Sequence, residues 1–197
     1  MTVFIGCMCM LMSVCYFLII PFVRLYTSGV TDINYIYKYL PILFCLVQIL
    51  SWSRYVTGNL IGISFRQKPA VKINILEAVI NLTLSIVFVF RIGIEGVLLA
   101  TVIALPIKVI YCTYVSDIII LKRSPWKSIL ILGSNYLAFG VCVFVHRYIN
   151  LEINNYMQLI GYGALLMCIM GTCFALINIG VNKDVIQTIN YLRNRKE

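Results

Sequence analysis

Residues 70–116 read AVKINILEAVINLTLSIVFVFRIGIEGVLLATVIALPIKVIYCTYVS, which is two long apolar runs joined by a short turn. The runs cover 70–90 and 94–116. Each can cross a bilayer, because a hydrocarbon core of about 30 Å needs roughly 20 apolar residues in a helix. The turn around Gly93 is so short that the two predicted helices must be antiparallel neighbours.

Four further apolar runs lie on either side of this pair, at 2–26, 39–61, 128–146 and 157–178. The runs are continuous rather than alternating, which favours helices over a barrel, since lipid leaves no partner for unpaired backbone groups. Hydrophobic residues make up 61% of the chain and charged residues 12%, whereas soluble domains carry roughly 25% charged residues. The first run is too long for a signal-peptide core, so we expect it to remain as a helix. The sequence therefore predicts an all-α, polytopic membrane helix bundle of about six transmembrane helices.

The formal net charge of +9 is distributed unevenly between the connections. The second and fourth connections and the C-terminal tail are the basic ones, and this pattern places them in the cytoplasm by the positive-inside rule. Both termini then lie inside, and the chain is expected in the cell membrane as a multi-pass protein in contact with the lipid bilayer. The excess charge is explained by orientation and anionic lipid, so no nucleic acid is expected as a partner. The basic residues are Arg54, Arg66, Lys68 and Lys72, then Lys122, Arg123 and Lys127, then Lys183, Arg193, Arg195 and Lys196.

The tail differs from the rest of the chain. Val185, Ile186, Ile189 and Leu192 follow a helical spacing among basic residues, which fits an amphipathic helix on the cytoplasmic leaflet as well as a solvated tail. The predicted organisation is a six-helix transmembrane domain over 1–180 and a basic amphipathic cytoplasmic tail over 181–197.

Cysteine and histidine patterns give no sign of a metal site or of catalysis. The eight cysteines all lie in apolar runs without a C-x-x-C pair, and His146 is the only histidine. Zinc sites need such residues at short spacing. The sequence also shows no Gly-rich phosphate loop, no nucleophile beside a base and no paired carboxylates. We therefore expect no metal, no cofactor and no enzymatic activity.

Three charged residues stand inside predicted spans, namely Arg54, Glu77 and Lys108. Each lies roughly 10–12 Å from the predicted cytoplasmic boundary at the helical rise per residue. Charges at this depth are costly and need a reason. Three explanations remain open. The residues can surround a cavity that admits a polar or anionic head group, or Glu77 can be the counter-ion of Arg54 or Lys108. The two basic residues can also reach the inner surface with their long side chains.

One face of the third predicted helix is polar. Asn74, Glu77, Asn81 and Ser85 recur every three or four residues, so this face must contact another helix or a cavity rather than lipid. Small residues at Gly96, Ala100 and Ala104 predict close packing of the next helix. The cargo or cavity candidates are Arg54, Glu77, Asn81 and Lys108.

Two longer segments resemble a known family. PFVRLYTSGVTDINYIYKYLP at 21–41 and GNLIGISFRQKPAVKINILEAVINLTLSIVFVFRIGIEGVLLATVIA at 58–104 resemble the C-terminal part of polysaccharide flippases. These are the O-antigen and capsule exporters of the multidrug/oligosaccharidyl-lipid/polysaccharide flippase superfamily. The nearest parts are the Leu-Tyr-Thr-x-Gly-Val segment, the helix with Glu77 and Asn81, and the turn from Gly93 into Ala100.

The resemblance implies a transporter that moves an undecaprenyl-linked oligosaccharide across the membrane by alternating access, for cell-surface polysaccharide biosynthesis. In the fourteen-helix form of the family this chain corresponds to the last six helices. The resemblance thus implies that an N-terminal lobe is missing, and a C-terminal fragment or a chain with a separate partner is expected. The alternatives are a drug or cation antiporter of the same superfamily, in which Glu77 carries protons or Na⁺, and a structural membrane subunit or non-functional remnant.

Overall fold

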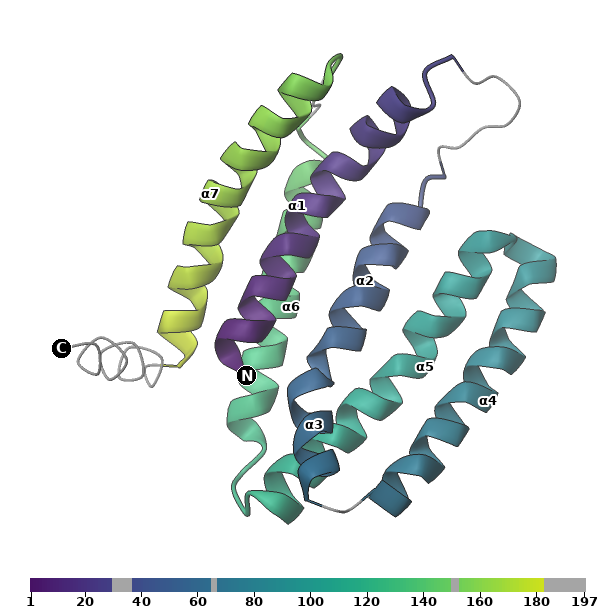
Figure 1. Ribbon diagram of the computed structural model, residues 1–197, viewed down its shortest axis with the longest axis vertical. Helices are drawn as coiled ribbons and strands as arrows, with labels where there is room; N and C mark the ends of the chain where they lie inside the picture. Colours follow the sequence, from purple (N-terminus) through teal and green to yellow (C-terminus); the bar gives the residue numbers. More distant parts are fainter. Residues whose placement is uncertain (30–36, 65–66, 150–152, 183–197) are drawn as a thin grey trace. The chain divides into compact units, whose positions relative to one another are not determined.

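The computed structural model describes residues 1–29, 37–64, 67–149 and 153–182. Within these ranges the chain is helical and contains no strand. The elements in chain order are α1 (Thr2–Tyr26), α2 (Leu40–Ser53), α3 (Tyr55–Ile63), α4 (Gln67–Ile92), α5 (Ile94–Tyr114), the π-helix η1 (Val115–Ile120), α6 (Trp126–His146) and α7 (Tyr156–Val181) (Figure 1).

Six helical segments of the described residues are long and apolar enough to cross a membrane. This confirms the predicted all-α fold with six transmembrane helices. The predicted tail helix falls mostly on 183–197 and lies outside the described residues, so it stays a prediction. The six segments are Thr2–Tyr26, Leu40–Ile63, Ala70–Ile92, Ile94–Ile120, Trp126–His146 and Tyr156–Val181.

The helices group into two compact units. The first unit joins the two ends of the chain, Met1–Ile36 and Ile129–Glu197, and the second is the continuous stretch Tyr37–Ser128. The sequence predicted a single transmembrane domain over 1–180, without a division inside it. The candidate residues Arg54, Glu77, Asn81 and Lys108 all belong to the second unit.

In the second unit, α4 and α5 form an antiparallel hairpin (Figure 1). Gly93 makes the turn with φ of 72°, a backbone conformation that favours glycine. Three residues later, a Cβ on Gly96 would come within 2.5 Å of the Phe88 carbonyl oxygen, so only glycine fits this approach. Ala100 and Ala104 are fully buried along the same line. The prediction of close packing through these small residues is confirmed.

The span Leu40–Ile63 is two helices rather than one. The helix is interrupted at Arg54, which ends α2 and begins α3. Below this break, Ile61 of α3 packs with Cys112 and Val115 in a small buried cluster. The interruption was not predicted, and it falls at a charged residue that the sequence singled out.

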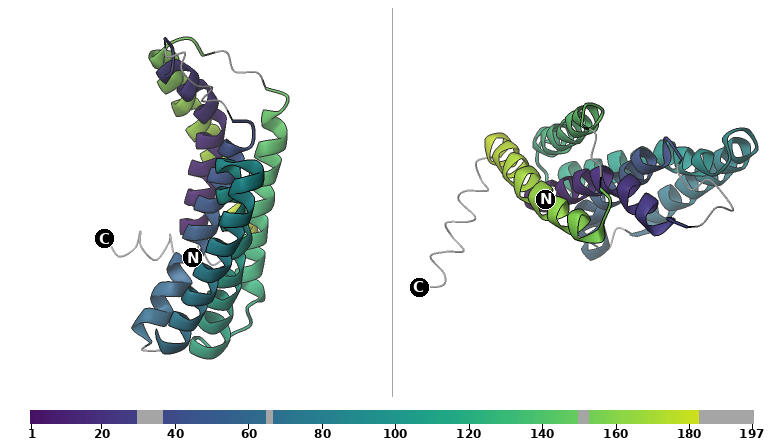
Figure 2. Two further views of the ribbon diagram at one scale, coloured as in Figure 1. Left: turned by 90° about the vertical axis from the view of Figure 1, so that its right-hand side faces the viewer. Right: turned by 90° about the horizontal axis from the view of Figure 1, so that it is seen from above.

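In the first unit, α1 and α7 lie side by side (Figures 1 and 2). Ile5, Cys9 and Phe17 of α1 are buried. The Nδ2 of Asn182 donates a 3.0 Å hydrogen bond to the Thr2 hydroxyl, which ties the end of α7 to the start of α1. Tyr16 of α1 meets Phe139 of α6 edge to face, with ring centroids 6.3 Å apart, so α6 also packs in this unit.

Candidate functional site

The centre of the candidate site is an ion pair between α4 and α5. Lys108 Nζ donates to Glu77 Oε2 at 3.0 Å. The two side chains are only 14% and 15% exposed. Since charges inside a membrane span are costly alone, this contact accounts for both of them at once. Of the two basic partners that the sequence offered Glu77, the structure pairs it with Lys108.

Beyond this pair, the polar face of α4 forms further hydrogen bonds, one of them to α5. Asn81 lies one helical turn from Glu77, and its Oδ1 accepts hydrogen bonds from Thr101 Oγ1 at 3.2 Å and from Ser85 Oγ at 3.3 Å. Three members of the polar stripe, Glu77, Asn81 and Ser85, are therefore engaged in side-chain hydrogen bonds. Asn74, the fourth member of the predicted stripe, lies three residues before Glu77 and is exposed.

Arg54 stands apart from this pairing. Its Nε is buried and has no hydrogen-bond partner, and no carboxylate among the described residues forms an ion pair with it. Its backbone carbonyl accepts from Gly58 N at 2.7 Å and from Thr57 Oγ1 at 3.1 Å, which starts α3. The side chain thus brings an uncompensated positive charge to the point where the span is interrupted.

The three charged candidates belong to one neighbourhood. Lys108 of α5 pairs with Glu77 of α4, and α5 also packs against α2, the helix that ends at Arg54. With Asn81 next to Glu77 on α4, the second unit gathers all four predicted residues around the α4–α5 hairpin. Chemically, the group offers one balanced ion pair, one amide with two hydroxyl donors, and one guanidinium without a counter-ion.

Sequence reasoning missed a buried amide pair in the first unit. Asn135 of α6 and Asn178 of α7 exchange two hydrogen bonds, each 3.0 Å from Nδ2 to Oδ1. Each Nδ2 also donates to its own helix, to the carbonyls of Ile131 and Phe174, both at 2.8 Å. Each asparagine inside an apolar run was a visible signal, because an amide in lipid needs a partner.

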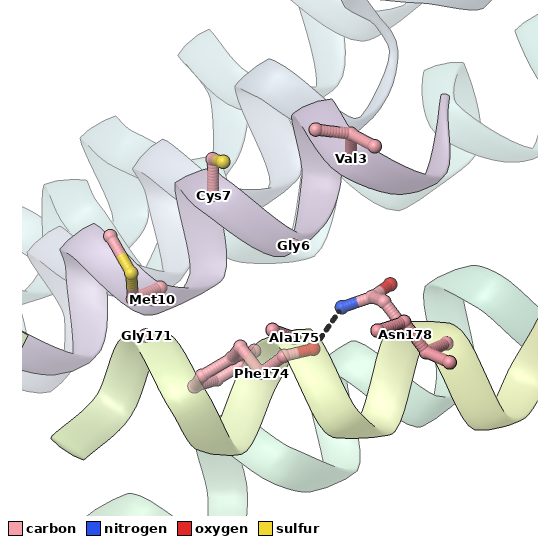
Figure 3. Close-up of a pocket in the computed structure, with 9 residues that line it drawn as sticks. Val3, Gly6, Cys7, Met10, Gly171, Phe174, Ala175 and Asn178 are labelled. Carbon is pink, nitrogen blue, oxygen red and sulfur yellow. Dashed lines mark hydrogen bonds between the residues drawn. The ribbon is translucent and has the colours of Figure 1, made fainter. Parts of the chain in front are cut away.

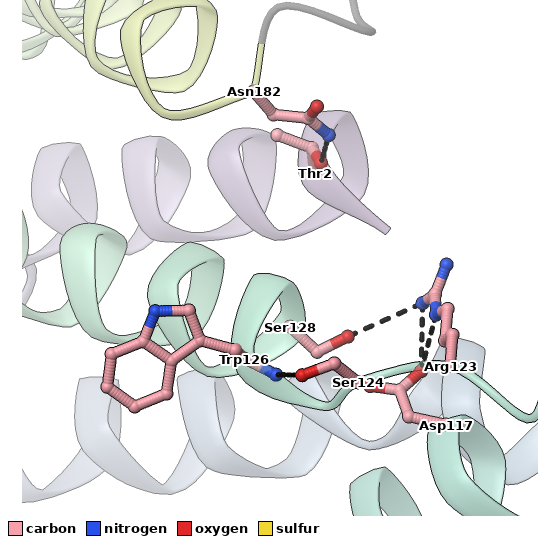
Figure 4. Close-up of polar contacts among 7 residues, drawn as sticks. All are labelled: Thr2, Asp117, Arg123, Ser124, Trp126, Ser128 and Asn182. Carbon is pink, nitrogen blue, oxygen red and sulfur yellow. Dashed lines mark hydrogen bonds and ion pairs between the residues drawn. The ribbon is translucent and has the colours of Figure 1, made fainter.

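A second missed feature is a buried carboxylate at the end of the fourth span. The sequence ended this helix at Ser116, whereas the structure continues it as the π-helix η1. Asp117 is fully buried there, and its Oδ1 accepts from Arg123 Nε at 3.0 Å and Nη2 at 2.8 Å. Arg123 also donates to Ser128 Oγ at 3.4 Å (Figure 4). The π-helix depends on hydrogen-bond register, which no apolar pattern reveals.

A cavity of about 220 Å³ opens between α1 and α7 in the first unit (Figure 3). Apolar side chains and glycines line it almost entirely, among them Val3, Met10, Gly171 and Phe174. Asn178 lies at its edge with its amide turned to the Phe174 carbonyl. None of the four predicted site residues lines this cavity.

Comparison with protein-family models, curated proteins and solved structures finds no match for this chain. Within the part of the chain that the structure describes, no three His, Cys, Asp or Glu side chains gather as a metal site would require. The site has therefore to be interpreted from its own geometry.

Proposed function

We propose that this chain is part of a membrane transporter that translocates a lipid-linked oligosaccharide for cell-surface polysaccharide biosynthesis. The six membrane-length helices and the resemblance of 21–41 and 58–104 to polysaccharide flippases support this function. The chain would lie in the cell membrane with both termini in the cytoplasm, as the distribution of basic residues suggests.

The observation that carries the proposal is the guanidinium of Arg54, which has no carboxylate partner among the described residues. A lipid-linked oligosaccharide of this kind carries a pyrophosphate, and arginine binds phosphate oxygens with paired, charge-assisted hydrogen bonds. The buried Nε of Arg54 has no partner, whereas Lys108 is already neutralised by Glu77 at 3.0 Å. Arg54 is therefore the residue that receives the anionic head group, and Lys108 with Glu77 fixes the hairpin beside it.

A missing lobe is the expected partner. Alternating access needs two walls around the cargo, and this chain supplies one part of them. The apolar part of α4 contains no buried residue, so this helix has an exposed surface that lipid or another helical segment can cover. Val79, Leu82 and Phe90 are among its exposed side chains, at 55%, 64% and 85%.

A cation antiporter is the second candidate function. The observation that favours it is the Glu77–Lys108 pair itself, because intramembrane carboxylates paired with lysine recur in proton and ion relays. In that case Glu77 carries the coupling ion and Arg54 is dispensable. The two functions therefore assign the essential charge to different residues.

Head-group binding separates them. The purified chain in nanodiscs of neutral lipid is tested by native mass spectrometry with undecaprenyl pyrophosphate, and with undecaprenol as the uncharged probe. We expect retention of the pyrophosphate alone, its loss in Arg54→Ala, and its persistence in Arg91→Ala, an exposed arginine at the far end of α4. Equal retention of the pyrophosphate by the wild type and Arg54→Ala would refute the proposed role of Arg54.

A further inference from the structure

Three buried oxygen atoms near the end of the fourth span have no hydrogen-bond partner. They are Thr113 Oγ1, Ser116 Oγ and Asp117 Oδ2. The three residues are 5%, 1% and 0% exposed. Buried polar atoms are nearly always paired, and an unpaired one calls for an explanation such as a catalytic role, a water or an ion. Three together cannot be treated as an isolated exception.

The three oxygens share one side of the helix. Thr113 is in the last turn of α5, and Ser116 and Asp117 follow in η1, three and four residues later. Side chains at these spacings are neighbours on a helix surface. The backbone N–H of Leu121 donates to the Ser116 carbonyl, five residues earlier, at 2.9 Å. This separation is that of a π-helix. Single π-turns inside α-helices occur frequently at functional sites.

Only one edge of the Asp117 carboxylate is used. Both nitrogen contacts from Arg123, at 2.8 and 3.0 Å, fall on Oδ1. Oδ2 therefore remains an acceptor with no donor, although an ionised carboxylate offers about four lone-pair positions. The neighbouring hydroxyls do not donate to it, since both are themselves without a partner. Beside the ion pair with Arg123, the helix therefore offers three oxygen atoms that no donor occupies.

We propose that Thr113, Ser116 and Asp117 form a binding site for a hard monovalent cation, with Na⁺ as the best fit. Hard cations select oxygen ligands, and this set contains one carboxylate and two hydroxyls without nitrogen or sulfur. A divalent ion is disfavoured, because Ca²⁺ and Mg²⁺ sites usually supply more carboxylate charge than a single group shared with Arg123.

The position in the helix favours a cation for an independent reason. The continuous helix Ile94–Ile120 ends three residues after Asp117, and the C-terminal end of a helix carries partial negative charge. A buried carboxylate at this end is electrostatically unfavourable unless positive charge accompanies it. Arg123 supplies one positive charge, from a side chain that is half exposed. Helix C-terminal ends coordinate Na⁺ in several secondary transporters.

The proposed site is distinct from the pair formed by Glu77 and Lys108. Asp117 lies nine residues beyond Lys108 along the same helix, and neither Glu77 nor Arg54 supplies one of the three unpaired oxygens. The inference goes beyond the proposed transport of an anionic lipid. It is based on the three oxygen atoms without a hydrogen-bond partner, whereas the transport proposal is based on the Arg54 guanidinium.

Equilibrium binding of radiolabelled Na⁺ to the purified chain in neutral-lipid nanodiscs tests the proposal, with choline chloride keeping the ionic strength constant. We expect saturable binding of one Na⁺ per chain. Thr113→Val together with Ser116→Ala removes two ligands and leaves the Asp117–Arg123 pair intact, so it should weaken binding at least roughly tenfold, as the loss of weaker outer-shell contacts already does at metal sites. Asp117→Asn should weaken it further if the variant folds.

The matched control is Thr172→Val with Ser134→Ala. These two hydroxyls donate to the carbonyls of Ile169 and Ile131, at 2.8 and 3.1 Å, and so are already satisfied. Na⁺ binding should be unchanged in this control and in the double variant Glu77→Gln, Lys108→Met, which leaves no unpaired charge. The proposal is overturned if the wild type binds no Na⁺ above the choline background, as a site filled by water would behave. It is also overturned if the Thr113→Val, Ser116→Ala protein binds like the wild type, or if only the Glu77→Gln, Lys108→Met protein loses the ion.

Discussion

Lys108 and Glu77 lie on neighbouring helices with Nζ 3.0 Å from Oε2, and both side chains are largely buried. The pair neutralises two charges inside spans that otherwise consist almost entirely of apolar residues. Its partners come from α4 and α5, so it also fixes the register of the hairpin.

The first prediction concerns this pair. Lys108→Met alone leaves Glu77 uncompensated and should lower stability by up to about 3–5 kcal/mol, the range for breaking a buried pair. Glu77→Gln together with Lys108→Met should recover most of this loss, because no net charge then remains in the span. Reversible unfolding in mixed micelles measures the difference. A double variant as unstable as Lys108→Met would show that the pair is not the source of the effect.

The second prediction concerns the tight turn of the hairpin. In Gly96→Ala the new Cβ would meet the Phe88 backbone carbonyl at 2.5 Å, and backbone cannot move aside as a flexible side chain can. We expect a loss of roughly 1–3 kcal/mol from this overpacking. Gly140→Ala is the control, because no atom lies within 4 Å of a Cβ built there. It should be neutral or stabilising, since alanine is the better helix former.

The spans were predictable because their signal is strong and local. The run 2–26 coincides with α1, and 94–116 differs from the span Ile94–Ile120 only at its end. That end is where the helix changes to π-helix, a change of hydrogen-bond register that apolar periodicity does not encode. The interruption at Arg54 escaped prediction for the same reason, since the residues on both sides of it are helix-compatible.

The sequence singles out the charged residues inside the spans, but it does not predict which of them pair. Three charges at one depth leave Arg54 and Lys108 as the possible counter-ions of Glu77. Which of the two pairs with it depends on how α4 is rotated against α5, and the sequence does not specify this rotation. In the structure, the packing of α4 against α5 brings Lys108 into contact with Glu77. The Asn135–Asn178 contact is a different case. An asparagine in an apolar run indicates that a hydrogen-bond partner is needed, but the two residues are too far apart in the sequence for the pairing to be predicted.

The third prediction concerns that amide pair. Asn135→Leu removes both exchanged hydrogen bonds, but Asn178 keeps its bond to the Phe174 carbonyl. The loss should therefore be moderate, about 1–2 kcal/mol, as for other interhelical hydrogen bonds in membranes. A double-mutant cycle with Asn178→Leu should give a coupling energy of about 0.5–2 kcal/mol. Additive effects of the two changes would contradict the pairing.

The fourth prediction is topological. Cysteines introduced by Arg66→Cys and by Ser28→Cys, in a background without reactive thiols, should lie on opposite sides of the membrane. The basic residues around the second connection predict a cytoplasmic position for it. A membrane-impermeant maleimide applied to intact cells should then label only the second variant, and permeabilised cells should allow both to react. External labelling of residue 66 would reverse the orientation of the whole chain.

The last prediction concerns completeness. If the proposed transport function holds, this chain, with six membrane-length helices among its described residues, should not restore polysaccharide export by itself in a flippase-deficient strain. Alternating access requires repeats or bundles that move against each other around the cargo, and under the proposed function this chain supplies only one part of them. Co-production with the segment that supplies the remaining lobe should restore export, and Arg54→Ala should then abolish it at unchanged protein level. Robust export by this chain alone would instead require copies of it to form both walls, and size analysis of the purified protein would then have to reveal a stable oligomer.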